Sequence, residues 1–476
     1  MTAIAPRSDS AFTLPASILR AYDIRGIYGE TLHDDTGYYV GRAFATWMAR
    51  NSNNPHPTIV TARDGRASSP ALTKTLIQGM VDAGAHVVDC GIGPTPMCYF
   101  ATLTLEADAG IMLTGSHNPP THNGFKMMMK SRPFFGDDIQ ALGSLIAAND
   151  FNSAQGTVTH HDIREAYVDR LLQGLRTEGA KPLTVVWDAG NGAAGEITEL
   201  LAQRLHGTHI TLFTEIDGTF PNHHADPTEE KNMQDLIAAV REHKADFGVA
   251  FDGDGDRIGA VDAGGTILWG DQMLTLYARE ILSRKPGATV IADVKASQTL
   301  FDDVLAHGGK PLMWKTGHSL IKSKMKETKA EIAGEMSGHI FFADGYYGFD
   351  DGLYAAVRLL DLVAHSDQTL EQMRTSIPHT YNTPEIRVDC TEERKFVIIE
   401  EVRARLYQMR EAGEALEINE ADGVRVSFRD GWWLARASNT QAAIIVRCEA
   451  QTTETLELLK QMVRDQMHAS HVSVTV

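Results

Sequence analysis

The chain of 476 residues has few cysteines and lacks long apolar runs. Cys90, Cys98, Cys390 and Cys448 form no CxxC or metal-ligand spacing, so we interpret them as reduced, buried thiols. No run of about 18 apolar residues is present, and residues 1–20 contain two prolines and no unbroken apolar segment of the signal-peptide type. These absences predict a soluble, cytoplasmic protein with no membrane partner.

Positive charge is also scarce, because 44 Lys and Arg residues face 62 Asp and Glu residues and leave a formal net charge of -18. Such a surface repels nucleic acids at long range, so we expect no nucleic-acid partner. A small anionic substrate remains compatible if Arg and Lys side chains gather in a pocket. With 43% hydrophobic and 22% charged residues, the composition is that of an ordinary globular protein. At roughly 150 residues per domain, the length predicts about three domains, with two or four also allowed.

An apolar run that ends in a polar loop occurs three times, at residues 58–64, 183–188 and 288–293. Each run predicts a buried strand. A helical pattern follows each run, at residues 71–83, 195–205 and 298–306, and a glycine with another apolar run comes next, as at 84–89. The order strand, helix, strand predicts parallel pairing.

A second phrase, again an apolar run followed by a polar loop, recurs at residues 107–117, 245–254 and 330–338. Chance similarity of short strands is the alternative explanation. If the repeat is real, three α/β domains each present a polar loop at the carboxyl end of a strand, where open α/β sheets bind ligands. From about residue 378 the phrase is lost, and a helical stretch at 394–412 with hairpin-like strands at 424–428 and 442–448 predicts an α+β domain. The expected domains are 1–160, 161–265, 266–378 and 379–476.

The first candidate loop is Thr114-Gly-Ser-His-Asn-Pro119, directly after an apolar run. Glycine beside Ser116 exposes its hydroxyl and lets backbone N–H groups approach a phosphate. His117 and Lys126 would supply positive charge or proton transfer. The same letters also suit a purely structural turn.

The second loop, Asp252-Gly-Asp-Gly-Asp256, places carboxylates at alternate positions. Intervening glycines let the backbone curl so that all three reach one hard divalent cation, magnesium or calcium rather than zinc. An EF-hand would need glycine and glutamate where Arg257 and Ala263 stand, so that interpretation fails. A solvated acidic turn is the alternative, disfavoured because three like charges repel.

Two further loops carry weaker signals. In Gly334-Glu-Met-Ser-Gly-His339, Glu335 and Ser337 alternate onto one face and would bind vicinal hydroxyls of a sugar, although a helix cap or turn explains the letters as well. Residues 436–441, Arg-Ala-Ser-Asn-Thr-Gln, offer a guanidinium and hydroxyls to a phosphate, with Arg447 nearby, and a plain hairpin is the alternative. Isolated candidates are Tyr22, Arg25, Lys295 and His318.

Taken in order, these four loops resemble those of the α-D-phosphohexomutase superfamily, most closely its bacterial phosphomannomutase/phosphoglucomutase branch. The match runs from about residue 19 to 450, and four loops in the family's order are far more specific than any one. The departures are an extension of about fifteen residues before the match and Gln441 followed by alanines. Neither touches a candidate catalytic position.

The resemblance implies a role for each matching residue. Ser116 would be the phosphoserine, and with Asp252, Asp254 and Asp256 it would bind Mg²⁺. Around the transferring phosphate and the reacting hydroxyl it implies Arg25, His117, Lys126, Arg257, Lys295 and His318. For substrate binding it implies Tyr22, Glu335, Ser337, His339, Arg436, Ser438, Asn439 and Thr440.

The resemblance also implies a fold and an activity. The fold is α/β, with three similar α/β domains with mixed sheets plus a C-terminal α+β domain around a central cleft. The activity is reversible interconversion of hexose 1-phosphate and hexose 6-phosphate, of mannose or glucose, with glucose 1,6-bisphosphate as activator, by a monomer or weak dimer. Alternatives are a phosphoglucosamine mutase, a metal-dependent phosphatase and a non-catalytic sugar-phosphate-binding protein.

Overall fold

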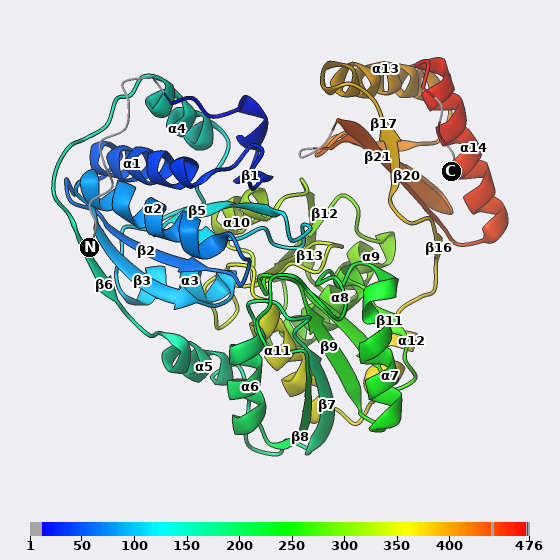
Figure 1. Ribbon diagram of the computed structural model, residues 1–476. Coiled ribbons are helices and arrows are strands. Elements are labelled where there is room, and N and C mark those ends of the chain that lie inside the picture. The colour runs from blue at the N-terminus through cyan, green and yellow to red at the C-terminus, as the bar shows by residue number, and fades with distance from the viewer. Residues whose placement is uncertain (1–11, 439–441, 473, 475–476) are drawn as a thin grey trace. The chain divides into compact units, whose positions relative to one another are not determined.

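The computed structural model describes residues 12–438, 442–472 and 474 (Figure 1). The chain divides into two compact units. The first comprises residues 1–173, 186–236 and 250–256, and the second comprises residues 174–185, 237–249 and 257–476.

The first unit contains a six-stranded mixed sheet in the order β1-β5-β4-β2-β3-β6. Its strands are β1 (Ile24–Ile27), β2 (Thr58–Arg63), β3 (His86–Ile92), β4 (Ala109–Leu113), β5 (His122–Met129) and β6 (Thr157–His160). Strand β2 pairs in parallel with β3 and β4, whereas β5 is antiparallel to β4 and β1. The apolar run of β2 is buried at its four central positions, which explains the absence of polar alternation in its sequence.

The helices of this part include a short 3-10 turn, η1 (Ala16–Ile18), and five α-helices. These are α1 (Asp34–Asn51), α2 (Ser69–Asp82), α3 (Thr95–Thr104), α4 (Asp137–Ala147) and α5 (Arg164–Leu172). The core of this part joins apolar side chains of α1, α2 and α4 to those of β1, β2, β4 and β5. The loops after β2 and β4 therefore stand on a rigid base.

A five-stranded sheet follows in the order β11-β10-β9-β7-β8. Its strands are β7 (Leu183–Asp188), β8 (Gly207–Leu212), β9 (Phe247–Phe251), β10 (Ile258–Asp262) and β11 (Ile267–Leu268), and its helices are α6 (Gly195–Arg204), η2 (Glu230–Met233) and α7 (Gln234–Glu242). All five residues of β9 are buried. The acidic segment 252–256 leaves directly from the carboxyl end of this strand.

A four-stranded sheet in the order β13-β12-β14-β15 lies wholly in the second unit. Its strands are β12 (Thr289–Asp293), β13 (Lys310–Trp314), β14 (Ile332–Gly334) and β15 (Ile340–Phe342). The associated helices are α8 (Gly270–Arg284), α9 (Gln298–Ala306), α10 (His318–Thr328), α11 (Gly352–Ala364) and α12 (Leu370–Thr375). Strand β12 pairs in parallel with β13 and β14, and β15 closes the sheet in the antiparallel direction.

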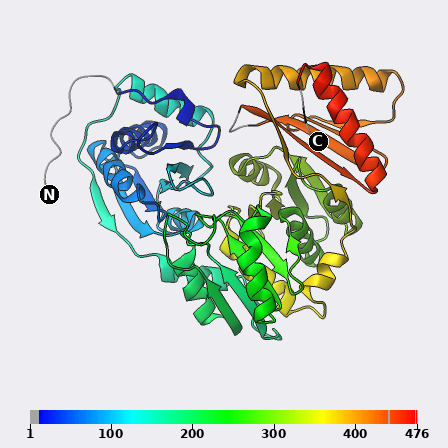
Figure 2. The ribbon, with the colours of Figure 1, turned by 45° about the vertical axis from the view of Figure 1, so that its right-hand side comes forward.

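The C-terminal sheet runs β16-β21-β20-β19-β18, and β17 also pairs with β21. The strands are β16 (Tyr381–Asn382), β17 (Ile386–Asp389), β18 (Glu417–Asn419), β19 (Val424–Phe428), β20 (Gly431–Ala437) and β21 (Ala443–Ala450). Helices α13 (Glu392–Glu411) and α14 (Thr453–Ala469) cover one face of the sheet, as Figure 2 shows, and share its core. This is the predicted α+β part.

The predicted strands and helices are confirmed to within about three residues, but β20 was not predicted. The sequence predicted a hairpin between the strands at 424–428 and 442–448, but β20 lies between them and pairs with both. Its sequence, Gly-Trp-Trp-Leu-Ala-Arg-Ala, does not alternate because five of its seven residues are buried. Arg436 therefore lies on a strand and not in a loop.

Candidate active site

Ser116 lies in the loop after β4, and its side chain is buried (2% exposed). Its hydroxyl donates to Asp252 Oδ2 at 3.0 Å and lies 3.2 Å from His117 Nδ1. The backbone at Ser116 has φ = 50°, a left-handed conformation that costs about 1–3 kcal/mol in a residue other than glycine. Its N–H donates to the Thr114 hydroxyl at 2.8 Å, which helps to hold this conformation.

The three aspartates that follow β9 are fully buried, and one oxygen from each lies within 4.8 Å of the others. Lys126 on β5 donates to Asp254 at 2.7 Å and to Asp256 at 2.5 Å. Although burial alone lowers the pKa of Lys126, these carboxylates raise it above its usual value, so the side chain stays an ammonium. Thr95 also donates to Asp254, at 2.5 Å.

This aspartate cluster fits a hard divalent cation. Its ligands are all carboxylate oxygens, which Mg²⁺ prefers. Asp254 Oδ1 is buried and accepts no hydrogen bond from any residue that the structure describes. Such an oxygen is costly to bury without a partner, and a bound cation would satisfy it.

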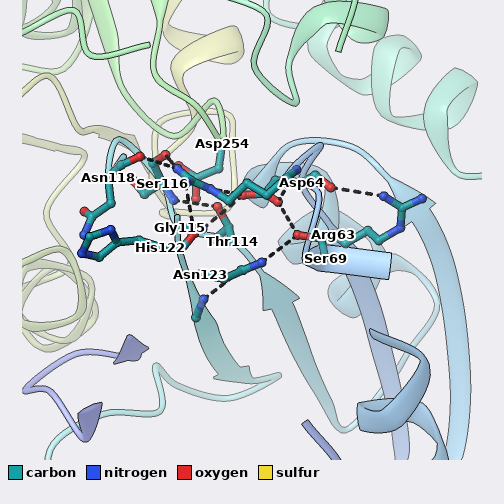
Figure 3. Close-up of polar contacts among 12 residues, drawn as sticks. Arg63, Asp64, Ser69, Thr114, Gly115, Ser116, Asn118, His122, Asn123 and Asp254 are labelled. Carbon is teal, nitrogen blue, oxygen red and sulfur yellow. Dashed lines mark hydrogen bonds and ion pairs between the residues drawn. The ribbon is translucent and has the colours of Figure 1, made fainter. Parts of the chain in front are cut away.

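The Ser116 loop rests on residues that follow β2 (Figure 3). Asp64 accepts the Gly115 N–H at 3.1 Å and the Ser69 hydroxyl at 2.6 Å. The guanidinium of Arg66 donates to Asp64 and to carbonyl groups of the loop. Burial lowers the pKa of Arg66, and the charge of Asp64 opposes that shift.

Arg25 on β1 approaches the same loop and donates to Asn118 Oδ1 at 3.0 Å and to Asp23 at 2.5 Å. Its Nε is buried and donates to no group of the described residues. Tyr22 is half-buried in the segment before β1. His117 is half-buried, and its carbonyl lies 2.5 Å from the ring nitrogen Nε2 of His224.

In the second unit, Glu335 lies in the turn after β14 and is buried. Its carboxylate accepts the Gly317 N–H at 2.6 Å and lies 2.9 Å from His339 Nδ1. Burial alone would raise the pKa of Glu335, but the hydrogen bond and charge of His339 lower it to about 2. Both carboxylate oxygens thus have protein partners. Glu335 and Ser337 belong to a turn, which is the alternative that the sequence left open for this segment.

Other predicted residues gather around His339. Ser337 Oγ lies 3.1 Å from its Nδ1, and Arg257 Nε donates to its Nε2 at 3.3 Å. The ring of His318 stacks on that of His339 with centroids 5.8 Å apart. His318 also lies 3.4 Å from Asp350. The structure therefore brings Arg257, His318, Glu335 and His339 into one cluster.

Lys295 follows β12 and is buried, with its Nζ 2.6 Å from Glu385 and 3.8 Å from Asp293. Burial alone lowers the pKa of Lys295, but the charges of Glu385 and Asp293 raise it above its usual value. Burial raises the pKa of Asp293 to about 6, while Lys295 opposes that shift. Asp293 also accepts the N–H of Met336 at 3.3 Å and the Thr316 hydroxyl at 3.2 Å, so it joins the predicted loop at 334–339 to the segment between β13 and α10.

Arg436 and Arg447 lie on β20 and β21 and are both buried. Arg436 donates from Nε to Asp422 at 2.8 Å, whereas its Nη2 has no acceptor among the described residues. Arg447 Nε and Nη1 are also buried and have no acceptor among the described residues. Ser438 is buried, and Asn439 and Thr440 lie outside the described residues.

Sequence reasoning missed several residues that shape these clusters. Arg66, Thr95 and His224 contact the loops of the first unit, and Glu385 and Asp422 contact Lys295 and Arg436 in the second. Only Arg66 had a signal, because it stands in a polar loop at the carboxyl end of a strand. All four cysteines are free, as predicted. Cys390 was predicted to be buried but is half-buried.

None of the helices in the described part of the chain has the length and apolar character needed to cross a membrane.

Four family models match the sequence. Their descriptions are phosphoglucomutase/phosphomannomutase alpha/beta/alpha domain I over residues 16–153, domain II over 165–265, domain III over 269–381, and the C-terminal domain over 385–466. Together they account for most of the chain and follow one another in the family's order.

Individual relatives agree with these matches. The chain is 47% identical to a phosphomannomutase/phosphoglucomutase of Pseudomonas aeruginosa over 465 residues, which cover 98% of both chains. It is 43% identical to a phosphoglucomutase of Neisseria gonorrhoeae, with 94% of this chain and 96% of the relative covered. A solved phosphoglucomutase/phosphomannomutase family protein from Burkholderia thailandensis has a TM-score of 0.90 at 41% identity, covering 98% of this chain and 100% of that one.

These matches define an enzyme of the isomerase class, a mutase that transfers phosphate within a hexose. The chain belongs to the phosphoglucomutase/phosphomannomutase family and has its four domains, three α/β and one C-terminal.

Proposed function

We propose that the enzyme interconverts hexose 1-phosphate and hexose 6-phosphate, of mannose, glucose or both, through a phosphoserine at Ser116 and a hexose 1,6-bisphosphate. The names of relatives at 43% and 47% identity support this substrate class. The observation that carries the proposal is the 3.0 Å hydrogen bond from the Ser116 hydroxyl to Asp252, within a buried group of three aspartates.

A covalent carrier is needed because O1 and O6 of one bound hexose are too far apart for direct transfer. The bond between phosphorus and Ser116 Oγ breaks as phosphorus bonds to the free sugar hydroxyl, whose proton passes to a base. The resulting bisphosphate turns end for end, and its other phosphoryl group returns to Ser116. Free glucose 1,6-bisphosphate acts as activator because it rephosphorylates an enzyme that has lost its phosphoryl group.

Charge neutralisation supplies much of the catalysis in phosphoryl transfer. Asp252, Asp254 and Asp256, together with Ser116, would hold Mg²⁺, which when bound neutralises charge on the transferring group. The Lys126 ammonium, the Arg25 guanidinium and His117 supply further positive charge or hydrogen bonds near Ser116.

Further residues bind the rest of the substrate in this proposal. Glu335, Ser337 and His339 contact sugar hydroxyls, and Tyr22 lines the entrance. Arg436 and Ser438, with Asn439 and Thr440, hold the phosphate that does not react. Because these residues bind the phosphate and not the sugar ring, the site can bind the bisphosphate in either orientation. Arg436 Nη2, which is buried and has no acceptor among the described residues, supports this role.

Three residues are candidates for the base near the reacting hydroxyl: Arg257, Lys295 and His318. His318 is held by Asp350 at 3.4 Å, and Lys295 by Glu385 at 2.6 Å. We further propose domains 1–160, 161–265, 266–378 and 379–476, a monomer or weak dimer, and a cytoplasmic location, where hexose phosphates occur.

Replacing the serine tests the proposal. Ser116→Ala should abolish mutase turnover because no atom remains to carry the phosphoryl group, while glucose 6-phosphate binding stays measurable by calorimetry. Peptide mass spectrometry should find a phosphoryl group on the wild-type peptide that contains Ser116, and this group should be lost on adding glucose 6-phosphate. Ser144→Ala, at an exposed position of α4, is the matched control and should be fully active.

Near wild-type turnover in Ser116→Ala would refute the proposal. Accumulation of free phosphate instead of the isomeric sugar phosphate would identify a phosphatase, and binding without either product would identify a non-catalytic protein.

A further inference from the structure

The loop between β2 and α2 contains a fully buried arginine outside the proposed catalytic set. Arg66 is 1% exposed, and all five of its guanidinium N–H groups have acceptors. The acceptors are Asp64 Oδ2 at 3.0 Å from Nε, the carbonyls of Pro119 and His122 at 2.5 and 3.0 Å from Nη1, and those of Ser116 and Asn118 at 2.7 Å each from Nη2.

This arrangement converges on one short segment. Four of the five acceptors are backbone carbonyls of residues 116–122, which form the loop that carries Ser116. Only Asp64 supplies a carboxylate, and the centroid of the Phe220 ring lies 5.3 Å from the guanidinium carbon. The planar five-donor fork of arginine can hold a curled backbone in this way, and the three donors of lysine cannot.

Arg66 and the Ser116 loop are in close van der Waals contact. A Cβ added to Gly115 would lie 2.4 Å from the Arg66 guanidinium carbon, so the loop backbone rests directly on the cation. The Gly115 N–H donates to Asp64, the same carboxylate that holds Arg66. The left-handed backbone of Ser116 is thus fixed from both sides, as a strained residue requires.

We propose that Arg66 is a positioning residue for phosphoryl transfer at Ser116. By holding the carbonyl groups of residues 116, 118, 119 and 122, Arg66 sets where the Ser116 hydroxyl lies relative to Asp252. This inference rests on the proposed function, in which Ser116 carries the phosphoryl group. Arg66 contributes through the loop backbone and transfers no proton.

The test is Arg66→Lys, which keeps the charge and removes the five-donor fork. Phosphorylation of dephosphorylated enzyme by glucose 1,6-bisphosphate is followed in a single turnover by intact mass. We expect its rate to fall about 100-fold, the effect of a misplacement of roughly 1 Å. In steady state kcat should fall while KM for glucose 1-phosphate stays within about two-fold, because the residues that bind substrate are intact.

Arg358→Lys is the matched control. Arg358 is also buried and donates to a backbone carbonyl, that of Asp344, and to the Glu280 carboxylate, and its hydrogen bonds and ion pairs with described residues include none proposed for catalysis. This variant should unfold at a lower temperature and phosphorylate Ser116 at the wild-type rate. Asp64→Asn, which keeps an oxygen acceptor and loses the charge, gives a milder second test with an expected fall of about ten-fold.

Wild-type phosphorylation rates in Arg66→Lys, or in Asp64→Asn should the lysine variant not fold, would overturn the inference and leave the proposed function standing. An equal loss of rate in Arg358→Lys would also overturn it, because general destabilisation would then explain the effect. Failure of the wild type to be phosphorylated at Ser116 would instead refute the proposed function.

Discussion

Single residues determine the charge balance at the aspartate cluster. Asp252, Asp254 and Asp256 carry three negative charges, and the ammonium of Lys126 offsets one of them. These four buried side chains therefore retain a charge of about -2, which is unfavourable in a site shielded from water. A divalent cation balances that charge, and a monovalent cation does not.

Magnesium should therefore stabilise the folded enzyme. Adding MgCl₂ to metal-free protein at about 100 times the dissociation constant should contribute about 2.7 kcal/mol, read as a rise in Tm of several degrees. Asp254→Asn should lose most of this rise because a ligand oxygen and a charge are removed. Asp150→Asn, at an exposed position, should keep it. An equal rise in both variants would show that Mg²⁺ acts elsewhere.

The residues of the first unit's cluster differ in how far sequence could predict them. Ser116 and the three aspartates stand in contiguous phrases whose letters already suggest their chemistry. Arg66 reaches Ser116 across 50 positions and Thr95 reaches Asp254 across 159, so their roles exist only after folding. Local sequence carries no record of such distant contacts.

Among the helices and strands, apolar runs predicted well where the buried strands begin and end. Strands β7 and β19 begin and end at the predicted residues because both are bounded by polar or turn residues. Strand β20 was missed because it is buried on both faces and carries Arg436. The close approach of α1 and α2 was also not predictable, because it depends on Gly41 and Gly79, where a Cβ would lie 2.2 Å and 2.0 Å from a carbonyl oxygen of the other helix.

An ion-pair network joins α8, α11 and the segment after β15. Asp344 accepts from Arg284, from Lys285 at 3.0 Å and from Arg358 at 3.2 Å. Burial alone would raise the pKa of Asp344, but the hydrogen bonds of Arg284 and Lys285 hold it well below its usual range. Since a carboxyl with a lowered pKa binds fewer protons when folded, its stabilisation is present at neutral pH and is lost in acid.

Asp344→Asn should therefore lower the free energy of unfolding by about 2 kcal/mol at pH 7. The difference from the wild type should narrow as the pH falls from 5 towards 3, because the unfolded wild type then gains a proton on Asp344 that the folded protein, with its lowered pKa, does not bind. Urea unfolding of both proteins at pH 7 and at pH 3 measures this difference in the free energy of unfolding. A difference that does not change with pH would show that packing, and not charge, is what the substitution removes.

At the scale of the whole molecule, the net charge of -18 opposes a phosphorylated substrate. Affinity must therefore come from a few local cations whose hydrogen-bonding groups are not already used. In the described part of the second unit, Arg436 and Arg447 fit this requirement, since Arg436 Nη2 and Arg447 Nε and Nη1 are buried and have no acceptor there. Their strands share a register in which both side chains project from the same face of the sheet.

Arg436→Ala should raise the dissociation constant for glucose 6-phosphate about 10–100-fold, because a charge-assisted hydrogen bond to phosphate contributes roughly 1.5–3 kcal/mol. The phosphoserine content of the purified variant, measured by intact mass, should stay at the wild-type level because Ser116 and its partners are unchanged. Arg50→Ala alters the net charge equally from an exposed position on α1 and should leave affinity unchanged. If both variants weaken binding to the same extent, long-range charge governs affinity and Arg436 does not hold the phosphate.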